Sequence, residues 1–495
     1  MAKQSAFSKQ HTLNEQKDVK ITERSCADFL NTELKATAQY IIETRALPSI
    51  MDGNRVGARK IIYAALTGDL KKHEEVKMQA LTGDTLKLEY NHGDSSLYGT
   101  VVQLSSPHTF SVAPLEVDGQ IGTLRVPDVD VAARYLKVSH SKFMPIFKMD
   151  WNLLELKTEE GTVVEPKFFL PIIPIALLWR TNSPGFGFSF KGFTFDLSDV
   201  VDATLEAVRS GSCTGLSGLG GSTPTAISQW IEMKPAIAGI KPENIIYNQS
   251  KQLYYNVGEY VISLESDTMF VKDLPFNMTY EKFEANLQEL LEKGYITDFV
   301  NRSRKGSINY IIKFATGRLK LLSTEKWKFF QTMKMFTKIP KLTLNCLDTN
   351  GKTILNYETP NDLVDAFVRR RLVYYQKRKT ITIDNLREEI FRLNNRRRFI
   401  QLVIDEKLII NKRPIEDIKK DLTKLQLPFD VLDLKISKLT IEEIKKLDDE
   451  IIDNQKELDY IMRTTIHELY INDLVELRRK YIGMGTMGDQ KIQNL

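Results

Sequence analysis

The sequence predicts a multidomain α+β protein: a small winged-helix unit, an α/β middle region and a long antiparallel coiled-coil stem. Three observations predict this. Short helices separated by turns precede a strand-and-loop region before residue 145. Mixed α/β texture fills residues 146–345, and an apolar repeat in three- and four-residue steps begins near residue 361. With 495 residues, the chain is long enough for about two to four domains.

Composition describes an ordinary globular chain and excludes several classes of protein. It is 42% hydrophobic and 27% charged, with a net charge of only +5, so charge placement must carry any argument for nucleic acid. No apolar run of membrane-spanning length occurs, and the polar N-terminus lacks a signal-peptide core. The cysteines Cys26, Cys213 and Cys346 lie far apart, which suits a reducing cytoplasm.

Residues 1–24 form a polar arm, for which disorder and docking onto a partner both remain open. Ser25 can cap the first helix, with Asp28 in the third position of a capping box. The apolar residues that follow at helical spacing are Leu30, Leu34, Ala38 and Ile41.

A second amphipathic segment follows the turn at 45–53. Its buried face is expected to hold Ile61, Ile62, Ala65 and Leu66. The cations expected off that face, where they could reach a run of phosphates, are Arg55, Arg59 and Lys60. An ordinary solvated helix face is the alternative interpretation.

The region up to residue 145 completes a winged helix-turn-helix pattern. A helix is expected over about 73–87, interrupted by Gly83, and another from Leu97 to about Leu104, capped by Asp94 or Ser95. Residues 108–131 are expected to form short strands and loops, a plausible wing. Alone, this pattern is a weak signal.

The middle region contains three notable segments. Residues 168–178 are apolar but broken by prolines, which predicts a buried strand and turn. Residues 182–188 form a glycine-bracketed loop with two aromatic side chains. Residues 211–222 are glycine-rich, but no Gly-Lys-Ser/Thr follows, so a flexible surface loop is expected instead of a phosphate loop. No ATP site is visible.

The last third predicts a helical stem capped at its start by Asn361 or Asp362, with a compact knob at about 405–440. A capping box at Thr440 and Glu443 starts the returning helix. Such a stem is typically an oligomerisation device. Residues 369–398 hold 11 Lys/Arg and 3 Asp/Glu, whereas 416–457 hold 8 and 12. The basic end suits phosphate, although ordinary solvated coiled-coil charge explains it equally well.

Several motifs occur in an order that together resembles one family. They are 46–53 (ALPSIMDG), 59–64 (RKIIYA), 91–98 (NHGDSSLY), 117–122 (VDGQIG), 132–135 (AARY), 165–171 (EPKFFLP), 273–276 (DLPF), 367–372 (FVRRRL) and 375–379 (YQKRK). The chain resembles the breakage–reunion, gyrase A-like subunit of type IIA DNA topoisomerases from about residue 25 to about residue 485. It is most similar to the medium subunit of the split topoisomerases of large tailed phages.

The resemblance implies a winged-helix DNA-gate domain at 25–145, a tower domain at 146–345 and a stem with a C-gate dimerisation knob at 346–495. It implies that Tyr135 attacks DNA to give a 5′-phosphotyrosyl link, that Arg134 offsets charge on the phosphate, and that His92 donates to phosphate or shuttles a proton. The residues it implies for DNA binding are Arg55, Arg59, Lys60, Asn91 and Ser95.

The resemblance also implies partners and cofactors. A Toprim/ATPase, gyrase B-like large subunit would hold both Mg²⁺ and ATP, and this chain would hold no metal; Asp128-Val129-Asp130 is interpreted as wing surface. Double-stranded DNA and a second copy of the chain complete the assembly. Relaxation and decatenation are expected in a cytoplasm, that of the host if the protein is phage-encoded. Gyrase-type supercoiling is not expected, because no DNA-wrapping domain follows the stem.

The sequence departs from the family at two places. Tyr90-Asn91 precedes the His-Gly-Asp motif where many relatives have a second histidine, and Phe186 replaces a family isoleucine that wedges between base pairs. Phe186 can intercalate in the same way, or it can be a buried loop aromatic. Two other functions stay open: a non-catalytic architectural DNA-binding dimer, which would form no tyrosine–DNA adduct, and a cellular topoisomerase IV A-type subunit.

Overall fold

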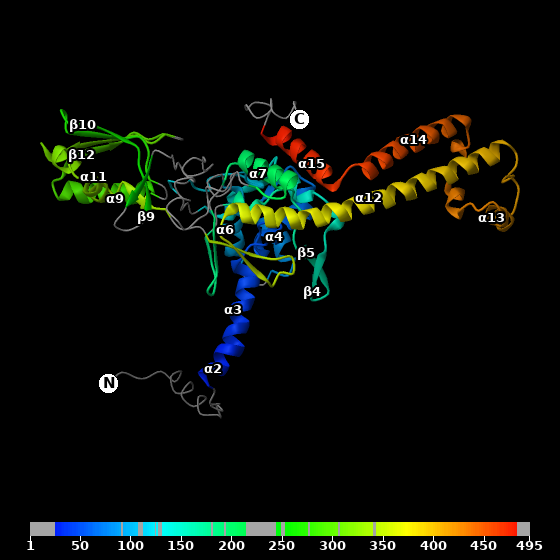
Figure 1. Ribbon diagram of the computed structural model, residues 1–495, viewed down its shortest axis with the longest axis horizontal. Helices are drawn as coiled ribbons and strands as arrows, with labels where there is room; N and C mark the ends of the chain where they lie inside the picture. The colour runs from blue at the N-terminus through cyan, green and yellow to red at the C-terminus, as the bar shows by residue number, and fades with distance from the viewer. Residues whose placement is uncertain are drawn as a thin grey trace, which may run out of the picture.

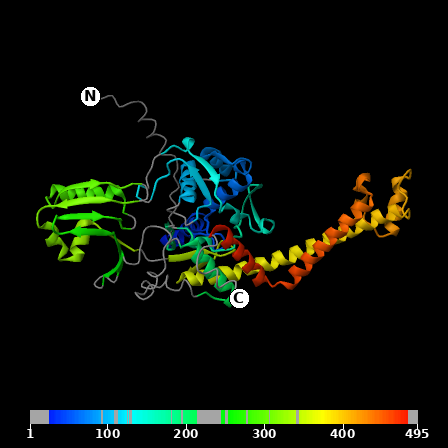
Figure 2. The same cartoon turned by 90° about the horizontal axis from the view of Figure 1, so that it is seen from above.

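The computed structural model describes residues 25–90, 93–106, 112–123, 125–126, 131–179, 182–192, 195–213, 244–248, 253–275, 278–304, 307–339 and 343–482. These residues form a central body with a lobe on one side and a long helical stem on the other (Figure 1). The view from above shows the same arrangement (Figure 2). Within these ranges, no helix is long and apolar enough to cross a membrane.

The first helical segment projects from the body (Figure 1) and starts where the sequence predicts. Ser25 is its N-cap, and the Ser25 hydroxyl accepts a hydrogen bond from the Asp28 N–H at 3.0 Å. Phe29, Leu30 and Tyr40 are about half exposed, so much of the apolar surface of this segment is not covered by the chain itself. The segment comprises α2 (Cys26–Phe29), η1 (Leu30–Leu34), α3 (Lys35–Ile41) and η2 (Ile42–Ala46).

Three helices and a three-stranded antiparallel sheet follow, with strand order β1-β3-β2. Their bounds are α4 (Val56–Thr67), η3 (Asp69–Lys71), β1 (Glu75–Lys77), α5 (Met78–Leu86), α6 (Asp94–Ser105), β2 (Leu115–Asp118), η4 (Ala133–Tyr135) and β3 (Lys137–His140). The helix expected over 73–87 was wrong at its start, because β1 pairs with β3 before the helix begins. Gly83 does not interrupt α5, and α6 starts three residues before the predicted Leu97.

The rest of the body is built from short elements and one helix. They are η5 (Met144–Lys148), η6 (Trp151–Leu153), β4 (Leu156–Glu159), β5 (Thr162–Pro166), η7 (Ile175–Leu177), β6 (Asn182–Pro184), β7 (Ser189–Lys191), α7 (Leu197–Ser210), β15 (Thr343–Leu347) and β16 (Ile354–Tyr357). Strands β16-β15-β7-β6 form one sheet, and β4 pairs with β5. The glycine-rich loop expected at 211–222 lies mostly outside the described residues.

One hydrophobic core unites the body and the base of the stem. Its buried residues run from Ile42 to Cys213 and continue with residues of 339–375 and 469–477. The predicted boundaries at residues 145 and 345 are therefore not where the buried core divides. Local sequence patterns cannot reveal the extent of the core, because the core joins segments that lie far apart in sequence.

The lobe has a separate core containing Met269, Phe283, Leu287, Tyr310 and Ile312. Its sheets have strand orders β14-β9-β8 and β10-β11-β13-β12. The bounds are β8 (Ile245–Asn248), β9 (Leu253–Val257), β10 (Tyr260–Ser263), β11 (Thr268–Val271), α9 (Tyr280–Glu292), β12 (Ile296–Asn301), β13 (Tyr310–Phe314), α10 (Arg318–Ser323), α11 (Lys326–Met333) and β14 (Phe336–Lys338).

In the stem, helices α12 (Pro360–Ile404) and α14 (Ile441–Arg463) lie side by side and run in opposite directions (Figures 1 and 2). The other bounds are α13 (Ile415–Lys424), η10 (Phe429–Asp433), η11 (Ile436–Lys438) and α15 (Ile466–Tyr481). Thr440 caps α14 as predicted, but α12 is capped by Thr359 and not by Asn361 or Asp362. Pro360 occupies the first helical position, which places the cap at Thr359, two residues before Asn361. The tip has its own core around Phe399, Leu422 and Val431.

The buried segment 168–178 is not the predicted strand: apart from the 3₁₀ turn η7 it is irregular, and its backbone groups bind side chains. The Phe169 N–H donates to Asp52 at 3.0 Å. The Pro171 carbonyl accepts from Arg371 Nε at 3.1 Å, and the Ile172 carbonyl accepts from the Tyr470 hydroxyl at 2.7 Å. Prolines remove sheet donors, so these side chains replace a strand partner.

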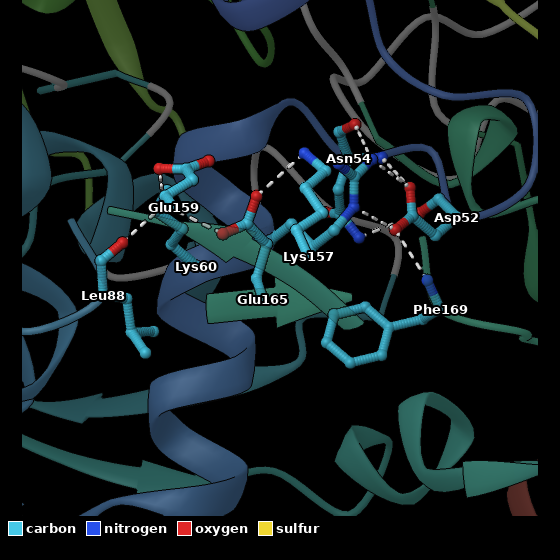
Figure 3. A network of polar contacts seen from close by, with 9 residues as sticks. Asp52, Asn54, Lys60, Leu88, Lys157, Glu159, Glu165 and Phe169 are labelled. Carbon is cyan, nitrogen blue, oxygen red and sulfur yellow. Dashed lines mark hydrogen bonds and ion pairs between the residues drawn. The ribbon is translucent and has the colours of Figure 1, made fainter. Parts of the chain in front are cut away.

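An ionic network lies beneath α4 (Figure 3). The buried Asp52 carboxylate accepts from Arg59 Nε at 2.7 Å and from Arg59 Nη2 at 3.0 Å. Lys60 Nζ lies 2.9 Å from Glu165 and 3.3 Å from Glu159. Lys157 reaches Glu165 at 3.0 Å. The network fixes the start of α4 against β4, β5 and the buried segment.

Replacing Asp52 should destabilise the body strongly. Asp52→Asn leaves the buried Arg59 guanidinium without a counter-charge, so the free energy of unfolding should fall by about 3 kcal/mol or more. Urea denaturation at neutral pH measures this. The control is Glu155→Gln, which removes the partner of Lys167 in a pair of similar length, 2.8 Å, whose side chains are about half exposed. Its expected cost is below about 1 kcal/mol, and equal losses in both variants would contradict the prediction.

Glu165 should make stability depend on acid pH. Burial raises its pKa, but the ammonium groups of Lys157 and Lys60 outweigh burial and hold the pKa below its usual value. The folded pKa lies below the unfolded value of about 4.3, so this contribution is present above that pH and is lost as pH falls through the folded pKa. Urea unfolding of wild type and Glu165→Gln from neutral to acid pH should show their stability difference shrinking. A stability difference between the two proteins that does not change with pH would contradict this role of Glu165.

Candidate nucleic-acid interface

Tyr135 and Arg134 lie together at the surface of the body. They belong to the single turn η4, in which the Tyr135 N–H donates to the Ala132 carbonyl at 3.0 Å. The Tyr135 side chain is 73% exposed, and the Arg134 guanidinium carbon lies 5.7 Å from the centre of its ring. The phenol is therefore accessible to a large substrate, with a cation held beside it.

The backbone that carries Tyr135 is fixed by its neighbours. Leu136 is buried, and its carbonyl accepts from the N–H of Met78, the first residue of α5, at 3.0 Å. Gly119 has a φ of +131°, and a Cβ there would lie 2.4 Å from Leu136 Cδ2. This φ lies in the region that favours glycine, so glycine suits the turn beside Leu136. A main chain held by these contacts thus presents the exposed phenol of Tyr135.

Helix α6 buries one face and exposes the other. Leu97, Val101 and Leu104 are buried, whereas the exposed side carries Asp94, Ser95, Ser96, Gly99 and Gln103. A Cβ at Gly99 would meet no atom within 4 Å. A glycine with free space in an exposed helix costs helix stability of about 1 kcal/mol and is not explained by packing. Asn91 and His92, both predicted site residues, lie outside the described residues.

Arg55 joins α4 to α6. It is the N-cap residue of α4; its guanidinium lies 5.4 Å from the Trp179 ring, and Nη2 lies 3.5 Å from Gln103 Oε1. Burial lowers the pKa of Arg55. The residue lines a cavity of about 610 Å³, whose other walls include Tyr40, Arg45, Lys60, Tyr90, Ser96 and Glu159. The predicted residues Arg55 and Lys60 thus both line this cavity, and Ser95 is the sequence neighbour of the lining residue Ser96.

The expected placement of Arg59 and Lys60 was wrong. Both side chains are at most 5% exposed, and both take part in the ionic network beneath α4. Arg59 Nη2 also donates to the Asn54 carbonyl at 2.9 Å. Helical periodicity placed these cations off the apolar face, but Asp52 and Glu165 make that side of α4 a buried, charge-paired face. Neither side chain is available to clamp a DNA strand directly.

Phe186 is an exposed aromatic side chain on a short turn. It occupies the turn between β6 and β7, is 47% exposed, and precedes Gly187, which has a φ of +74°. The alternative of a buried loop aromatic is therefore wrong for this chain. Gly185 packs against the N-terminal segment, since a Cβ there would lie 2.9 Å from Ala46 Cβ. The turn is thus held firmly while Phe186 and the 40%-exposed Phe188 face outward.

The basic end of the stem is partly used inside the protein. Arg371 is fully buried beside Asp150, Arg370 pairs with Asp348 at 2.7 Å, and Arg378 pairs with Asp473 at 2.7 Å. These three charges hold the stem to the body and do not form a free phosphate-binding surface. Neither interpretation offered for this charge included such a role.

Two residues important to the site were missed from the sequence. Arg45 lines the cavity beside Arg55. Arg125 is held by the lobe through four side-chain hydrogen bonds, although its partners are about 150 residues away. No local pattern signals either role. Among the described residues no three His, Cys, Asp or Glu side chains gather as metal ligands, and Asp128 and Asp130 lie outside them.

Comparisons with known proteins agree on one family. A family model for the A-type subunit of DNA gyrase/topoisomerase IV matches residues 45–477. DNA topoisomerase 2 of Plasmodium falciparum (isolate K1 / Thailand) is 24% identical over 92% of this chain and 34% of its own length. The mitochondrial DNA topoisomerase 2 of Dictyostelium discoideum is 26% identical over 93% of this chain and 35% of its own length. DNA topoisomerase 2 of Invertebrate iridescent virus 6 is 24% identical, with 92% and 39% covered.

A solved structure shares the fold. It is the DNA-binding, cleavage and re-ligation domain of Plasmodium falciparum topoisomerase II, with a TM-score of 0.75, 23% identity, and coverage of 94% of this chain and 66% of that one. The chain spans about a third of the length of the curated relatives it matches. Because the family model covers most of the chain, including Arg55, Arg134, Tyr135 and the stem, the chain belongs to the family of DNA gyrase/topoisomerase IV A-type subunits.

Proposed function

We propose that this chain is the DNA cleavage and religation subunit of an ATP-dependent type IIA DNA topoisomerase, with Tyr135 as the nucleophile. One observation carries the proposal. Within the matched family region, Tyr135 is a strongly exposed phenol on an immobilised backbone, with the Arg134 guanidinium over its ring. That combination suits attack on a large, anionic substrate.

The proposed chemistry exchanges one phosphodiester for another. A tyrosine hydroxyl with a pKa of about 10 is a weak nucleophile, so it must lose its proton as Oη bonds to phosphorus. The bond from phosphorus to the 3′-oxygen breaks, and that oxygen takes up a proton. Arg134 offsets the charge that develops on the phosphate, and we assign His92 to phosphate binding or proton transfer. Bond types are conserved, so the 3′-hydroxyl can reverse the step.

DNA would lie across α6 and the start of α4. The exposed side of α6 offers Ser95 and the open space at Gly99, and Arg55 lies at the adjoining cavity. A hydroxyl and a missing side chain allow a phosphate backbone to approach closely. We also assign Asn91 to DNA contact, on the resemblance alone. Arg59 and Lys60 act indirectly, because their ion pairs hold the α4 start that places Arg55.

We propose that Phe186 inserts between base pairs and bends the duplex. Apolar side chains that unstack a base step kink DNA, and Phe186 is an exposed aromatic on a turn fixed by Gly185 and Gly187. Its replacement of the family isoleucine keeps the apolar character.

The assembly would be a dimer of this chain with a second type of subunit. At the stem tip, Ile409, Ile415 and Phe429 are each more than half exposed, and such apolar side chains suit contact with a second copy. Mg²⁺ and ATP we assign to a Toprim/ATPase, gyrase B-like partner, as in the split enzymes of large tailed phages. Mg²⁺ held by that partner would stabilise the leaving oxygen of the DNA. Among the described residues of this chain, no three His, Cys, Asp or Glu side chains lie together as possible metal ligands.

Tyr135→Phe should abolish covalent DNA cleavage. Without the hydroxyl no phosphotyrosyl bond can form, whereas the ring and the fold remain. The full complex is incubated with supercoiled DNA and Mg²⁺, quenched with detergent and examined for protein on the 5′ ends of linear DNA. Wild type should give an adduct and the variant none, with equal DNA binding. No adduct from wild type with a competent partner would favour the architectural dimer.

Phe186→Ala should reduce DNA bending, and Phe188→Ala is the matched control two residues away. Both remove an exposed aromatic from the same turn, but only Phe186 is assigned to intercalation. Fluorescence energy transfer between the ends of a short duplex measures the bend. The Phe186 variant should shift the transfer efficiency toward straight DNA, and the Phe188 variant should resemble wild type. Equal effects, or none, would remove the assignment.

A further inference from the structure

Both terminal nitrogens of the Arg125 guanidinium, Nη1 and Nη2, donate hydrogen bonds to the lobe. Nη1 donates to the carbonyls of Pro275 at 2.8 Å and Met278 at 2.9 Å. Nη2 donates to Asp273 Oδ1 at 2.9 Å and to the Leu274 carbonyl at 2.7 Å. The side chain is only 11% exposed. Three of the four acceptors are backbone carbonyls in one short loop, a fork geometry that suits arginine and that lysine cannot reproduce.

The backbone of Arg125 binds the lobe as well. Its carbonyl accepts from the Tyr280 N–H at 3.1 Å, and Tyr280 is the first residue of α9. The first N–H groups of a helix have no partner within it, so Arg125 satisfies one of them. The turn around Arg125 is itself closed, since the Thr123 N–H donates to the Val126 carbonyl at 2.8 Å. Side chain and main chain together make this a specific contact between body and lobe.

The same chain segment carries Tyr135. Asp118 pairs with Lys137, and Gly119 packs on Leu136, so both ends of the connection between β2 and β3 are fixed to the body. Arg125 lies between those ends and binds the lobe. Gly119, six residues before Arg125, packs on Leu136, the neighbour of Tyr135, so release of Arg125 from the lobe would act first on the part of the connection that touches Leu136. In Figures 1 and 2 the lobe lies on the side of the body opposite the stem.

We propose that Arg125 is a positioning residue for DNA cleavage: it couples the placement of the lobe to the segment that presents Arg134 and Tyr135. This rests on the proposed function of Tyr135. Arg125 acts through the connection and contacts neither the reacting phosphate nor the phenol. Misplacing a catalytic group by about 1 Å can cost about a hundredfold in rate, so a loosened connection should slow cleavage while DNA affinity is kept.

The test uses Arg125→Met in the full complex with the partner subunit, Mg²⁺ and a duplex labelled at one end. Methionine fills part of the site but donates no hydrogen bond. The rate of adduct formation at Tyr135 should fall by at least about tenfold, with the dissociation constant for DNA unchanged. Arg125→Lys and Asp273→Asn should lose less, because lysine still donates to carbonyls and asparagine keeps the Oδ1 acceptor. Arg302→Met, which removes an exposed lobe arginine, controls for loss of charge.

Hydrogen exchange by mass spectrometry provides a readout independent of activity. In Arg125→Met, peptides covering 112–126 and 273–283 should both exchange faster, and in Arg302→Met neither should. If wild type forms no adduct, the function proposed for Tyr135 fails and exchange alone decides the coupling. The positioning role is overturned if Arg125→Met cleaves at the wild-type rate, if its DNA binding falls in parallel with cleavage, or if exchange in the two peptides is unchanged.

Discussion

The fold depends on one buried stretch of chain, residues 168–174, that belongs to no strand. Backbone groups without water or a sheet partner must find other partners, and here they do so through side chains. Asp52 binds the N–H of Phe169, and Arg371 and Tyr470 bind the next carbonyls along the stretch. These partners come from the turn before α4, from α12 and from α15. The requirement therefore draws the N-terminal helices and both ends of the stem onto one centre.

This constraint also determines what the interface can use. Arg59 pairs with the buried Asp52 carboxylate, and Lys60 pairs with the buried Glu165 carboxylate, so neither cation is free to serve the interface. Buried pairs of this kind contribute little net stability compared with apolar packing, but breaking one is costly. Their effect is to define where α4 begins. Arg55 is consequently left at the helix start, half-buried beside a cavity, as the cation of this helix that a ligand can approach.

The sequence predicted those features that depend on residues close together in the chain. The caps at Ser25 and Thr440 both follow from residues within one turn of helix. Strand β1 was missed because three residues, two of them charged, become a strand only by pairing with β3. Arg59 and Lys60 were misplaced for the same kind of reason, since an apolar stripe does not reveal that charged partners can bury its polar side.

The motif match identified the family from sequence, because its motifs are short and contiguous. The same match proposed the neighbours Arg134 and Tyr135 as site residues, and the structure shows Tyr135 exposed with Arg134 beside its ring. The anchoring of Arg125 was invisible, since its acceptors are carbonyls, which every residue possesses. When a side chain binds backbone carbonyls, only the donor residue can be recognised in the sequence, because any residue can supply the acceptor. For the same reason the junction of stem and body around Arg371 could not be predicted.

The unbroken length of α12 gives that junction mechanical leverage. Between Arg378, which pairs with Asp473 at the base, and Ile404 at the end, the helix extends for about 39 Å at 1.5 Å per residue. A tilt of about 10° about the base would carry the far end through about 7 Å, given that length. A sub-ångström repacking around Tyr375 and Tyr470, whose rings stack at 4.4 Å, is therefore amplified many-fold at the opposite end of the molecule.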